Sequence, residues 1–151
     1  MKLRRMKRED VDQVSRLYQD ANQFTTLKNI HRWTLEGLHK FPQLNFVIEK
    51  EQEIIGAISA VLKNKKCAEI NDIAVEREYQ SQQLGQKLME RLLQELKQQE
   101  IEKVTLWVHW KNSRAIPFYY RWGFKIKSIS RTNNIPDVPD GEDIIHLERK
   151  L

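Results

Sequence analysis

The sequence predicts a mixed α/β fold, in which helices flank a central β-sheet. The chain has 151 residues, of which 40% are hydrophobic, and this is enough for the core of one domain. Strand-like and helical stretches follow one another in the order β-α-α-β-β-β-α-β-α-β-β. The sequence has no linker, low-complexity tract or internal repeat, so we expect residues 1–151 to form a single domain.

Composition argues against several classes of protein. No apolar run approaches the ~20 residues of a membrane-spanning helix, so we expect no membrane partner. The basic start Met1–Arg5 is not followed by the apolar run of a secretory signal, which favours a cytoplasmic protein. The single cysteine, Cys67, leaves no internal disulfide and no cysteine-rich metal site, and we expect no metal cofactor.

The chain is basic, with a formal net charge of +5 and a sequence pI near 9.3. Basic side chains cluster in residues 2–8 and are otherwise spread out, as on a solvated surface. Such a charge suits a polyanionic cofactor or a nucleic acid. The sequence has no helix-turn-helix spacing, zinc knuckle or ribonucleoprotein motif, so a nucleic-acid partner is not expected.

The first third of the chain predicts a strand, two helices and a hairpin. We expect a short strand over Lys2–Met6 and a second helix over about Ile30–Lys40, which ends before a proline. The first helix has one apolar face, formed by Val11, Val14, Leu17, Tyr18 and Ala21. Leu44–Ile48 and Ile54–Leu62 are rich in β-branched residues and flank a polar turn, which predicts an antiparallel hairpin.

The central stretch is a strand over Glu69–Val75, a polar turn over Glu76–Gln83 and a helix from about Leu84. The apolar face of this helix repeats at helical spacing, with Leu84, Leu88, Met89, Leu92, Leu93 and Leu96. Backbone N–H groups are unpaired at the start of a helix, and the helix dipole adds partial positive charge there. The turn before Leu84 therefore predicts a phosphate site.

The last third predicts a strand over Val104–Trp110 and a short helix over Ser113–Trp122. The strand follows the central one through a helix, so the two should be parallel neighbours joined by a right-handed crossover. Two more strands, Phe124–Ser130 and Asp143–Arg149, flank the loop Arg131–Gly141.

Two motifs carry a family resemblance. Ala74-Val75 followed by Gln80-x-x-Gln83-x-Gly85 resembles the cofactor motif (Arg/Gln)-x-x-Gly-x-(Gly/Ala) of the GNAT superfamily of N-acetyltransferases. Gln83 stands where the motif has its first glycine, which lets the backbone approach the cofactor pyrophosphate closely. A glutamine there must turn its side chain away or hold the phosphate further off.

The second motif lies at the last predicted helix and resembles the family's Asn-x-x-Ala-x-x-x-Tyr-x-x-x-Gly-Phe at every named position: Asn112, Ala115, Tyr119, Gly123 and Phe124. We expect Asn112 to cap the helix and Tyr119, seven residues later, to lie on the same face. Gly123 can close the helix in the left-handed conformation. Pro117 predicts a bent or late-starting helix, because proline lacks the N–H of a helical hydrogen bond.

The resemblance implies a GNAT-type sheet, mixed but mostly antiparallel, with a splayed parallel strand pair and flanking helices. It implies an enzyme that moves an acetyl group from acetyl-CoA to a primary amine of a small molecule or of a protein or peptide, by direct attack in a ternary complex. The alternative is a non-catalytic acyl-CoA-binding sensor of the same fold. Whether the chain forms a homodimer is left open.

The resemblance also implies the site residues. The cofactor-binding set is Ile73, Ala74, Val75, Gln80, Ser81, Gln82, Gln83, Leu84, Gly85, Gln86, Asn112, Ala115 and Tyr119. The backbone of Ile73 and Val75 would pair with the pantetheine arm, and N–H groups from Ser81 to Gln86 would hold the pyrophosphate. Tyr119 is the expected acid that protonates the departing thiolate.

Glu69 is the expected base, because it lies eleven residues before Gln80, the offset of the catalytic glutamate in the histone-acetyltransferase branch. Asp72 is the competitor, and strict strand alternation puts the two carboxylates on opposite faces. His109 and a water chain remain open as bases. Cys67 lies before the central strand, away from both motifs, so no acyl-cysteine intermediate is expected.

The acceptor amine is less well specified. In the family it is shaped by the loop between the first two helices and by the last hairpin, which here contain Phe24, His31, Trp33, Asp137, Asp140, Glu142 and Asp143. Acidic residues at that mouth would suit a cationic amine, although they can equally form a solvated acidic turn.

Overall fold

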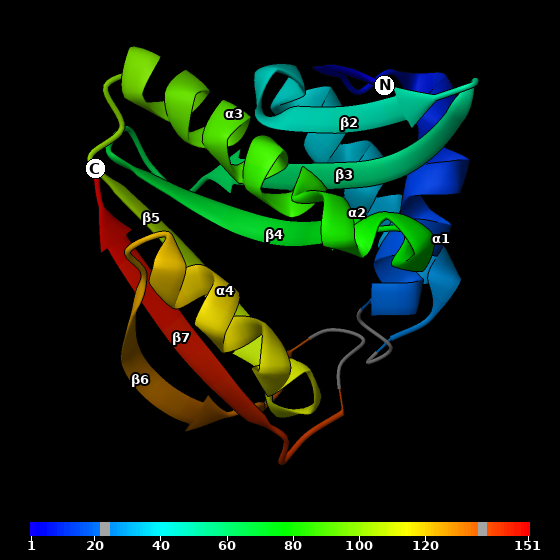
Figure 1. Ribbon diagram of the computed structural model, residues 1–151. Helices are drawn as coiled ribbons and strands as arrows, with labels where there is room; N and C mark the ends of the chain where they lie inside the picture. Colours follow the sequence, from blue (N-terminus) through cyan, green and yellow to red (C-terminus); the bar gives the residue numbers. More distant parts are fainter. Residues whose placement is uncertain (22–24, 136–138) are drawn as a thin grey trace.

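A seven-stranded β-sheet runs through the molecule in the order β1-β2-β3-β4-β5-β7-β6 (Figure 1). The computed structural model describes residues 1–21, 25–135 and 139–151. The strands are β1 (Lys2–Arg5), β2 (Asn45–Lys50), β3 (Glu53–Leu62), β4 (Cys67–Val75), β5 (Lys103–His109), β6 (Lys125–Arg131) and β7 (Asp143–Lys150). Neighbouring strands are antiparallel except for β4 and β5, which are parallel. The predicted mixed, mostly antiparallel sheet is confirmed.

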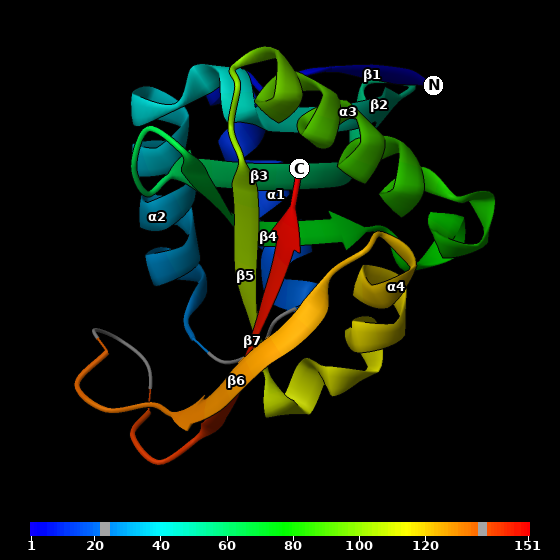
Figure 2. The same cartoon turned by 90° about the vertical axis from the view of Figure 1, so that its left-hand side faces the viewer.

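Helices cover both faces of the sheet. They are α1 (Val11–Ala21), α2 (Leu27–Lys40), α3 (Leu84–Gln98) and α4 (Ile116–Arg121). Short 3-10 segments lie between each helix and a neighbouring strand, at Arg8–Asp10, Pro42–Leu44, Arg77–Gln82 and Trp110–Ala115. Figure 2 shows α2 and α3 on opposite sides of the sheet, and α1 lies with α2 while α4 lies with α3.

The core consists of one apolar cluster on each face, and each cluster uses the predicted helix face. Under α3, Leu88, Leu92 and Leu96 are fully buried against the sheet. Under α1, Val14 and Tyr18 are fully buried in the second cluster. The apolar stripes at a spacing of 3.6 residues thus fix which way each helix faces.

The parallel strands β4 and β5 separate partway along their length. Their register pairs Cys67 with Lys103, Ala68 with Val104 and Glu69 with Thr105. Beyond these pairs β4 continues to Val75 and β5 to His109, so the far halves of the two strands diverge (Figure 1). The splayed strand pair is confirmed. It leaves backbone N–H and C=O groups along one edge of β4 unpaired by β5, so an extended ligand could bind there.

A β-bulge interrupts β4 at Asn71. Across the β3–β4 ladder, Ser59 pairs with Asp72 and the next residue, Ala60, pairs with Ile70. Asn71 is therefore the extra residue of the bulge, and such a residue rotates the following part of its strand.

The bulge corrects the expected alternation of β4. Ile70 and Ile73 both pack with the cluster under α3, whereas Ala74 packs with the cluster under α1. Strict alternation puts Ile70 and Ala74 on one face, and this is wrong because the bulge inserts one residue between them. Glu69 and Asp72, predicted on opposite faces, consequently lie on the same face of the strand.

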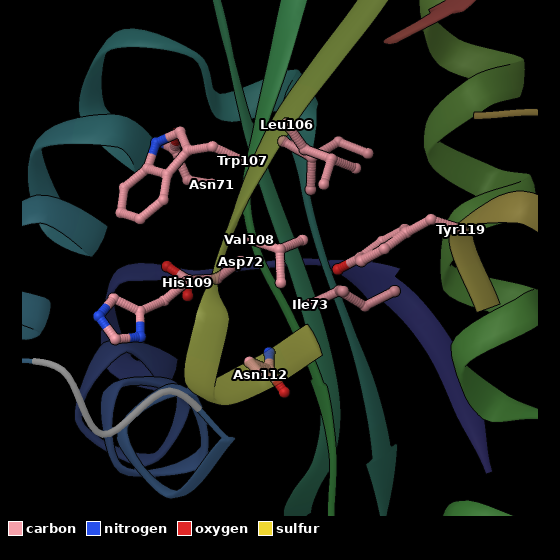
Figure 3. A pocket seen from close by; sticks show the side chains of 10 residues that line it. Asn71, Asp72, Ile73, Leu106, Trp107, Val108, His109, Asn112 and Tyr119 are labelled. Atoms are coloured by element: carbon pink, nitrogen blue, oxygen red, sulfur yellow. The ribbon is translucent and has the colours of Figure 1, made fainter. Parts of the chain in front are cut away.

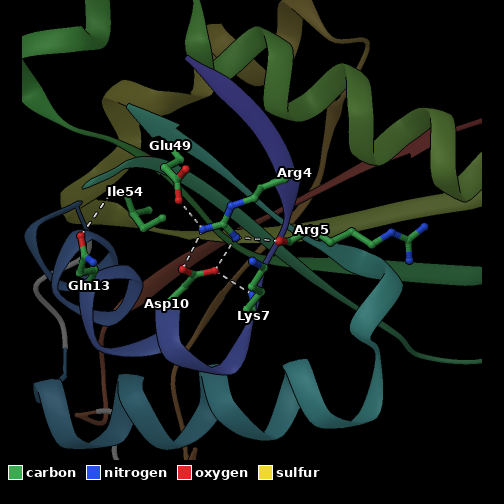
Figure 4. Close-up of polar contacts among 7 residues, drawn as sticks. All are labelled: Arg4, Arg5, Lys7, Asp10, Gln13, Glu49 and Ile54. Carbon is green, nitrogen blue, oxygen red and sulfur yellow. Dashed lines mark hydrogen bonds and ion pairs between the residues drawn. The ribbon is translucent and has the colours of Figure 1, made fainter. Parts of the chain in front are cut away.

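A partly buried arginine links the start of the chain to the sheet (Figure 4). Arg4 on β1 donates to both carboxylate oxygens of Asp10, at 2.7 and 3.0 Å, and to Glu49 Oε1 on β2 at 2.8 Å. The backbone N–H of Lys7 also donates to Asp10 Oδ2 at 2.8 Å. The side chains of Arg4 and Asp10 are 14% and 7% exposed, so the pair is held with little solvent screening.

Asp10→Asn is expected to lower the free energy of unfolding by about 2 kcal/mol at neutral pH, since it leaves the partly buried Arg4 short of one charged partner. Burial alone would raise the pKa of Asp10, but hydrogen bonds from Arg4 and the Lys7 N–H outweigh it, and the pKa lies below its usual value. A carboxylate with a lowered folded pKa stabilises above its unfolded pKa and loses this contribution as pH falls through the folded pKa.

The variant should therefore approach wild-type stability at acidic pH, as measured by urea unfolding at neutral and acidic pH. Asp12→Asn, at a side chain that is 75% exposed, is the matched control and should change little. An equal deficit of Asp10→Asn at both pH values would contradict the account.

Candidate active site

A small cavity of about 40 Å³ lies between the splayed ends of β4 and β5 (Figure 3). Its lining comes from both strands and from the segment that leads through α4: Ile70, Asn71, Asp72, Ile73, Leu106, Trp107, Val108, His109, Asn112 and Tyr119. In Figure 3, Tyr119 approaches from one side of β5, while Asp72, Trp107 and His109 lie on the other. The lining of the cavity therefore includes side chains from both sides of β5.

A larger groove of about 1110 Å³ adjoins the cavity, and its lining comes from the end of α1, the end of β4, the turn before α3 and the segment that leads through α4. The two share Ile73, Asn112 and Tyr119 as lining residues. The rest of the groove is lined by Leu17, Asp20, Ala21, Ala74, Val75, Glu76, Arg77, Glu78, Gln80, Gln83, Gly85, Gln86, Arg114, Ala115, Phe118 and Arg121. An elongated ligand in this groove would pass along the open edge of β4 and reach the cavity with one end.

The groove brings together most of the predicted cofactor residues. Ten of them line it: Ile73, Ala74, Val75, Gln80, Gln83, Gly85, Gln86, Asn112, Ala115 and Tyr119. Ser81, Gln82 and Leu84 do not line the described groove, and the side chain of Leu84 is 1% exposed in the core. Any part these three play through their backbone N–H groups stays a prediction.

The turn before α3 is held by its own residues. Gln80 Nε2 donates to the carbonyl of Val75 at 3.1 Å, which fixes the turn to the end of β4. Gln83 adopts the left-handed conformation, with φ 60° and ψ 27°, directly before the helix begins. Glycine adopts this backbone shape without strain, whereas glutamine adopts it at a cost.

Gln83→Gly is expected to raise the free energy of unfolding by about 1 kcal/mol, because glycine has no steric penalty at positive φ. For a chain of this size the thermal midpoint should rise by roughly 2–4 °C. Gln82→Gly is the control: Gln82 lies inside the 3-10 segment and not at positive φ, so glycine there should lower the midpoint. A midpoint lowered equally by both substitutions would contradict the role of the left-handed turn.

The second motif starts its helix differently from the expectation. His109 caps the 3-10 segment Trp110–Ala115 that leads into α4, and its Nδ1 accepts the N–H of Lys111 at 3.2 Å. Asn112 has a non-helical backbone, with φ −110° and ψ 21°, so the prediction that Asn112 caps the helix is wrong. The predicted late start is confirmed, since α4 begins only after Ala115 and places Pro117 in its first turn, where the missing N–H costs little.

The end of α4 follows the motif. Gly123 has φ +85°, and its N–H donates to the carbonyl of Tyr120 at 3.0 Å. The N–H of Phe124 donates to the carbonyl of Tyr119 at 3.1 Å, and the Phe124 side chain is fully buried. The predicted left-handed closure by Gly123 is confirmed.

Tyr119 is buried between two aromatic rings and reaches the cavity. Its ring packs edge-on against Phe118 and Phe124, with centroids 5.4 and 5.9 Å away, and it is 7% exposed. In Figure 3 its hydroxyl points toward the centre of the cavity. Burial, and then the negative charge of Asp72, raise the pKa of Tyr119 well above its usual value. The phenol is therefore a protonated donor at physiological pH.

The two candidate carboxylates lie in different surroundings. Glu69 lies where β4 and β5 are still paired, lines neither the cavity nor the groove as described, and has Oε2 3.7 Å from Lys63 Nζ. Asp72 lines the cavity and is the one carboxylate among the described lining residues. Its charge also helps to raise the pKa of the fully buried Tyr18, after the effect of burial.

His109 lines the cavity, but both ring nitrogens have neighbours. Nδ1 accepts the Lys111 N–H, so a neutral ring carries its proton on Nε2, which lies 3.9 Å from Glu142 Oε2. Trp110 Nε1–H donates to the same Glu142 oxygen at 2.7 Å. Burial lowers the pKa of His109, which favours the neutral ring. A ring with a lowered pKa, whose Nδ1 already accepts an N–H, is a weak base for an amine proton.

Of the residues predicted to shape the acceptor site, Glu142 approaches the cavity through its contact with His109. Phe24 and Asp137 lie outside the described residues. The remaining four line neither cavity nor groove in the described part of the chain: His31, Trp33, Asp140 and Asp143.

Sequence reasoning missed the cationic side chains of the groove, Arg77, Arg114 and Arg121. Arg114 and Arg121 lie within the second motif, and their basic character was the available signal. The described residues contain no group of three or more His, Cys, Asp or Glu side chains that could hold a metal ion. None of the described helices is long and apolar enough to span a membrane.

Comparison with known proteins agrees with this geometry. Residues 4–124 match the Acetyltransferase (GNAT) family. The ribosomal protein bS18-alanine N-acetyltransferase of Escherichia coli strain K12 is 34% identical over 103 residues, which cover 68% of each chain. The chain spans 62% and 29% of the length of two other curated relatives that it matches.

Two solved structures share the fold. The structure of Ard1 from Thermoplasma volcanium has a TM-score of 0.85 at 22% identity and covers 99% of this chain and 97% of that one. The structure of the PaiA N-acetyltransferase from Thermoplasma acidophilum in complex with coenzyme A has a TM-score of 0.74 at 20% identity, covering 99% and 98%. From the family match, the chain belongs to the acetyltransferase (GNAT) family of N-acetyltransferases, which take acetyl-CoA as the acetyl donor.

Proposed function

We propose that the chain is an acetyl-CoA-dependent N-acetyltransferase whose acceptor is the α-amine of a polypeptide. The observation that carries the proposal is the cavity between β4 and β5, which shares lining residues with the cofactor-sized groove and has lining side chains on both sides of β5. A donor in the groove and an acceptor on the other side of β5 would meet there, as direct attack in a ternary complex requires.

The groove supports binding of the whole cofactor. The pantetheine arm would lie along the open edge of β4 at Ile73 and Val75, as an added strand would, and the phosphates would lie at the turn before α3. This arrangement would place the thioester beside Tyr119. The thioester is already activated, so the protein has to position it, handle one proton and stabilise the departing thiolate.

The proton chemistry favours an α-amine over a lysine. An α-amine has a pKa of about 7.7–8.0 and is partly neutral at physiological pH, whereas a lysine amine, at about 10.4, is almost wholly protonated. A cavity with the single described carboxylate Asp72 and a neutral His109 suits the less demanding acceptor. The bS18 relative is named for an alanine acceptor, and alanine has only its α-amine.

The proton roles follow from the same geometry. Tyr119 would donate to the thiolate from the groove side, and Asp72 would accept the amine proton from the other side, directly or through water. Glu69, the base expected from the sequence, lies outside the cavity and stays a prediction that mutation can test. The cytoplasmic location and a homodimer also stay predictions.

An acceptor panel tests the proposal by release of free thiol from acetyl-CoA. The panel contains a peptide that starts with alanine, the same peptide with a blocked N-terminus and an internal lysine, spermidine and an aminoglycoside. We expect turnover with the free N-terminus and little with the blocked peptide. Faster turnover of spermidine or of the aminoglycoside would assign a small-molecule acceptor, and binding of acetyl-CoA without turnover of any amine would indicate a sensor.

Direct transfer also predicts that Cys67→Ala keeps most of the activity. The Cys67 side chain is buried, its Sγ lies 3.6 Å from the Ala68 carbonyl, and it lines neither the cavity nor the groove. Mass spectrometry of the protein mixed with acetyl-CoA alone should show no acylated chain. An inactive Cys67→Ala protein together with a trapped acyl-enzyme would contradict a ternary complex.

A further inference from the structure

We propose that Arg121, with Arg114, forms a cationic wall that binds the cofactor phosphates and makes the enzyme select intact CoA over fragments without phosphate. Both arginines line the groove together with Gln83 and Gly85 of the turn before α3. The inference rests on the proposed function, because it concerns the same groove. It adds two residues outside the cofactor motif.

Packing between α4 and α3 places Arg121. A Cβ atom at Gly85 would lie 3.4 Å from Phe118 Cε1, so the Phe118 ring lies directly against the start of α3. The guanidinium carbon of Arg121 is 6.0 Å from the centroid of that ring, one helical turn further along α4. The guanidinium thus lies over the ring that packs on the helix start, where backbone N–H groups and the helix dipole favour an anion.

The two arginines are available for a ligand. Both are exposed, and neither forms an ion pair or hydrogen bond with a described residue. The other charged residues that line the described groove come from α1 and from the turn after β4: Asp20, Glu76, Arg77 and Glu78. A guanidinium presents paired N–H donors that match a phosphate, and these charge-assisted bonds are stronger than neutral ones.

Gln83, which replaces the first glycine of the cofactor motif, gives a reason for additional phosphate-binding residues. Gln83 has a left-handed backbone, which glycine adopts freely, but it carries a side chain where the motif glycine has none. That side chain lines the groove and limits how closely a pyrophosphate can approach the backbone N–H groups. Arginines on the facing wall would supply attraction from the opposite side of the same phosphates.

The test compares acetyl-CoA with acetyl-pantetheine, which carries the same thioester arm and no phosphate. We expect Arg121→Gln to raise KM for acetyl-CoA on the order of 10-fold with kcat unchanged, the size of one lost charge-assisted bond. Arg114→Gln should act in the same direction, and Arg121→Lys should recover part of the loss. KM for acetyl-pantetheine should be the same in all these proteins.

Arg16→Gln is the matched control, because Arg16 is exposed on α1 and does not line the groove. It makes the same change of charge and should leave both KM values unchanged. An unchanged KM for acetyl-CoA in Arg121→Gln, or an equal rise for both donors, would overturn the inference. Calorimetric titration of wild type and Arg121→Gln with CoA and pantetheine gives the same comparison without turnover. An inactive protein can therefore still show whether Arg121 binds the phosphates, so a failure of the proposed catalysis is distinguishable from a failure of this inference.

Discussion

Tyr119→Phe should lower kcat on the order of 10²-fold, the lower end for loss of a general acid. The substitution keeps the ring between Phe118 and Phe124 and removes only the hydroxyl that points into the cavity. KM for acetyl-CoA should change little, since the hydroxyl acts mainly as negative charge develops on the leaving sulfur. Steady-state kinetics with a saturating peptide acceptor measures this split.

The neighbouring tyrosine is the control. Tyr120 is 49% exposed and lines neither the cavity nor the groove, so Tyr120→Phe should retain wild-type kcat. Burial and the charge of Asp72 raise the pKa of Tyr119, so the acid should stay protonated and cause no loss of kcat at mildly alkaline pH. An unchanged kcat in Tyr119→Phe would show that the thiolate leaves without a tyrosine acid.

Asp72→Asn should lower kcat/KM by roughly 10²–10³-fold below the acceptor pKa, because the acceptor amine then lacks a base. The loss should shrink as pH rises through the acceptor pKa of about 8, where the amine becomes neutral without help. The amide keeps the size of the side chain beside Tyr119 and removes its charge. A pH profile of kcat/KM with the peptide acceptor measures the effect.

Glu69→Gln is the matched comparison, since it makes the same change three residues away on the same strand. Asp72 lines the cavity and Glu69 does not, so the pH-dependent loss should follow Asp72. If Glu69→Gln shows that loss and Asp72→Asn does not, the base is the residue that the sequence predicts. If both variants keep the wild-type profile, the proton leaves without either carboxylate.

Much of the fold could be predicted because it follows from local patterns. The apolar stripe of α3 and the strand–turn–helix order fix the parallel pair, and Pro117 fixes the late start of α4. The bulge at Asn71 could not be predicted in this way, since a bulge depends on how β3 and β4 pair across the sheet. The missed bulge changed the faces assigned to Glu69 and Asp72.

In the candidate site, too, residues set by local spacing could be predicted, and residues set by contacts between elements could not. Tyr119 and the turn around Gln83 follow from residue spacing within one motif each, and both reach the groove. The cap at His109 was missed because its side chain, and not that of Asn112, meets the first free N–H. Arg121 was missed because its position depends on Phe118 packing against Gly85, which is a contact between two helices.

Hydrogen exchange with and without CoA tests the central claim, that the cofactor lies along the open edge of β4 and ends in the cavity. CoA should slow exchange of backbone amides in residues 73–75 and 83–86, where the arm and the phosphates would be bound. Amides of β6, which lines neither the cavity nor the groove, should exchange as before. Unchanged exchange at β4 and at the turn before α3 under saturating CoA would contradict the account.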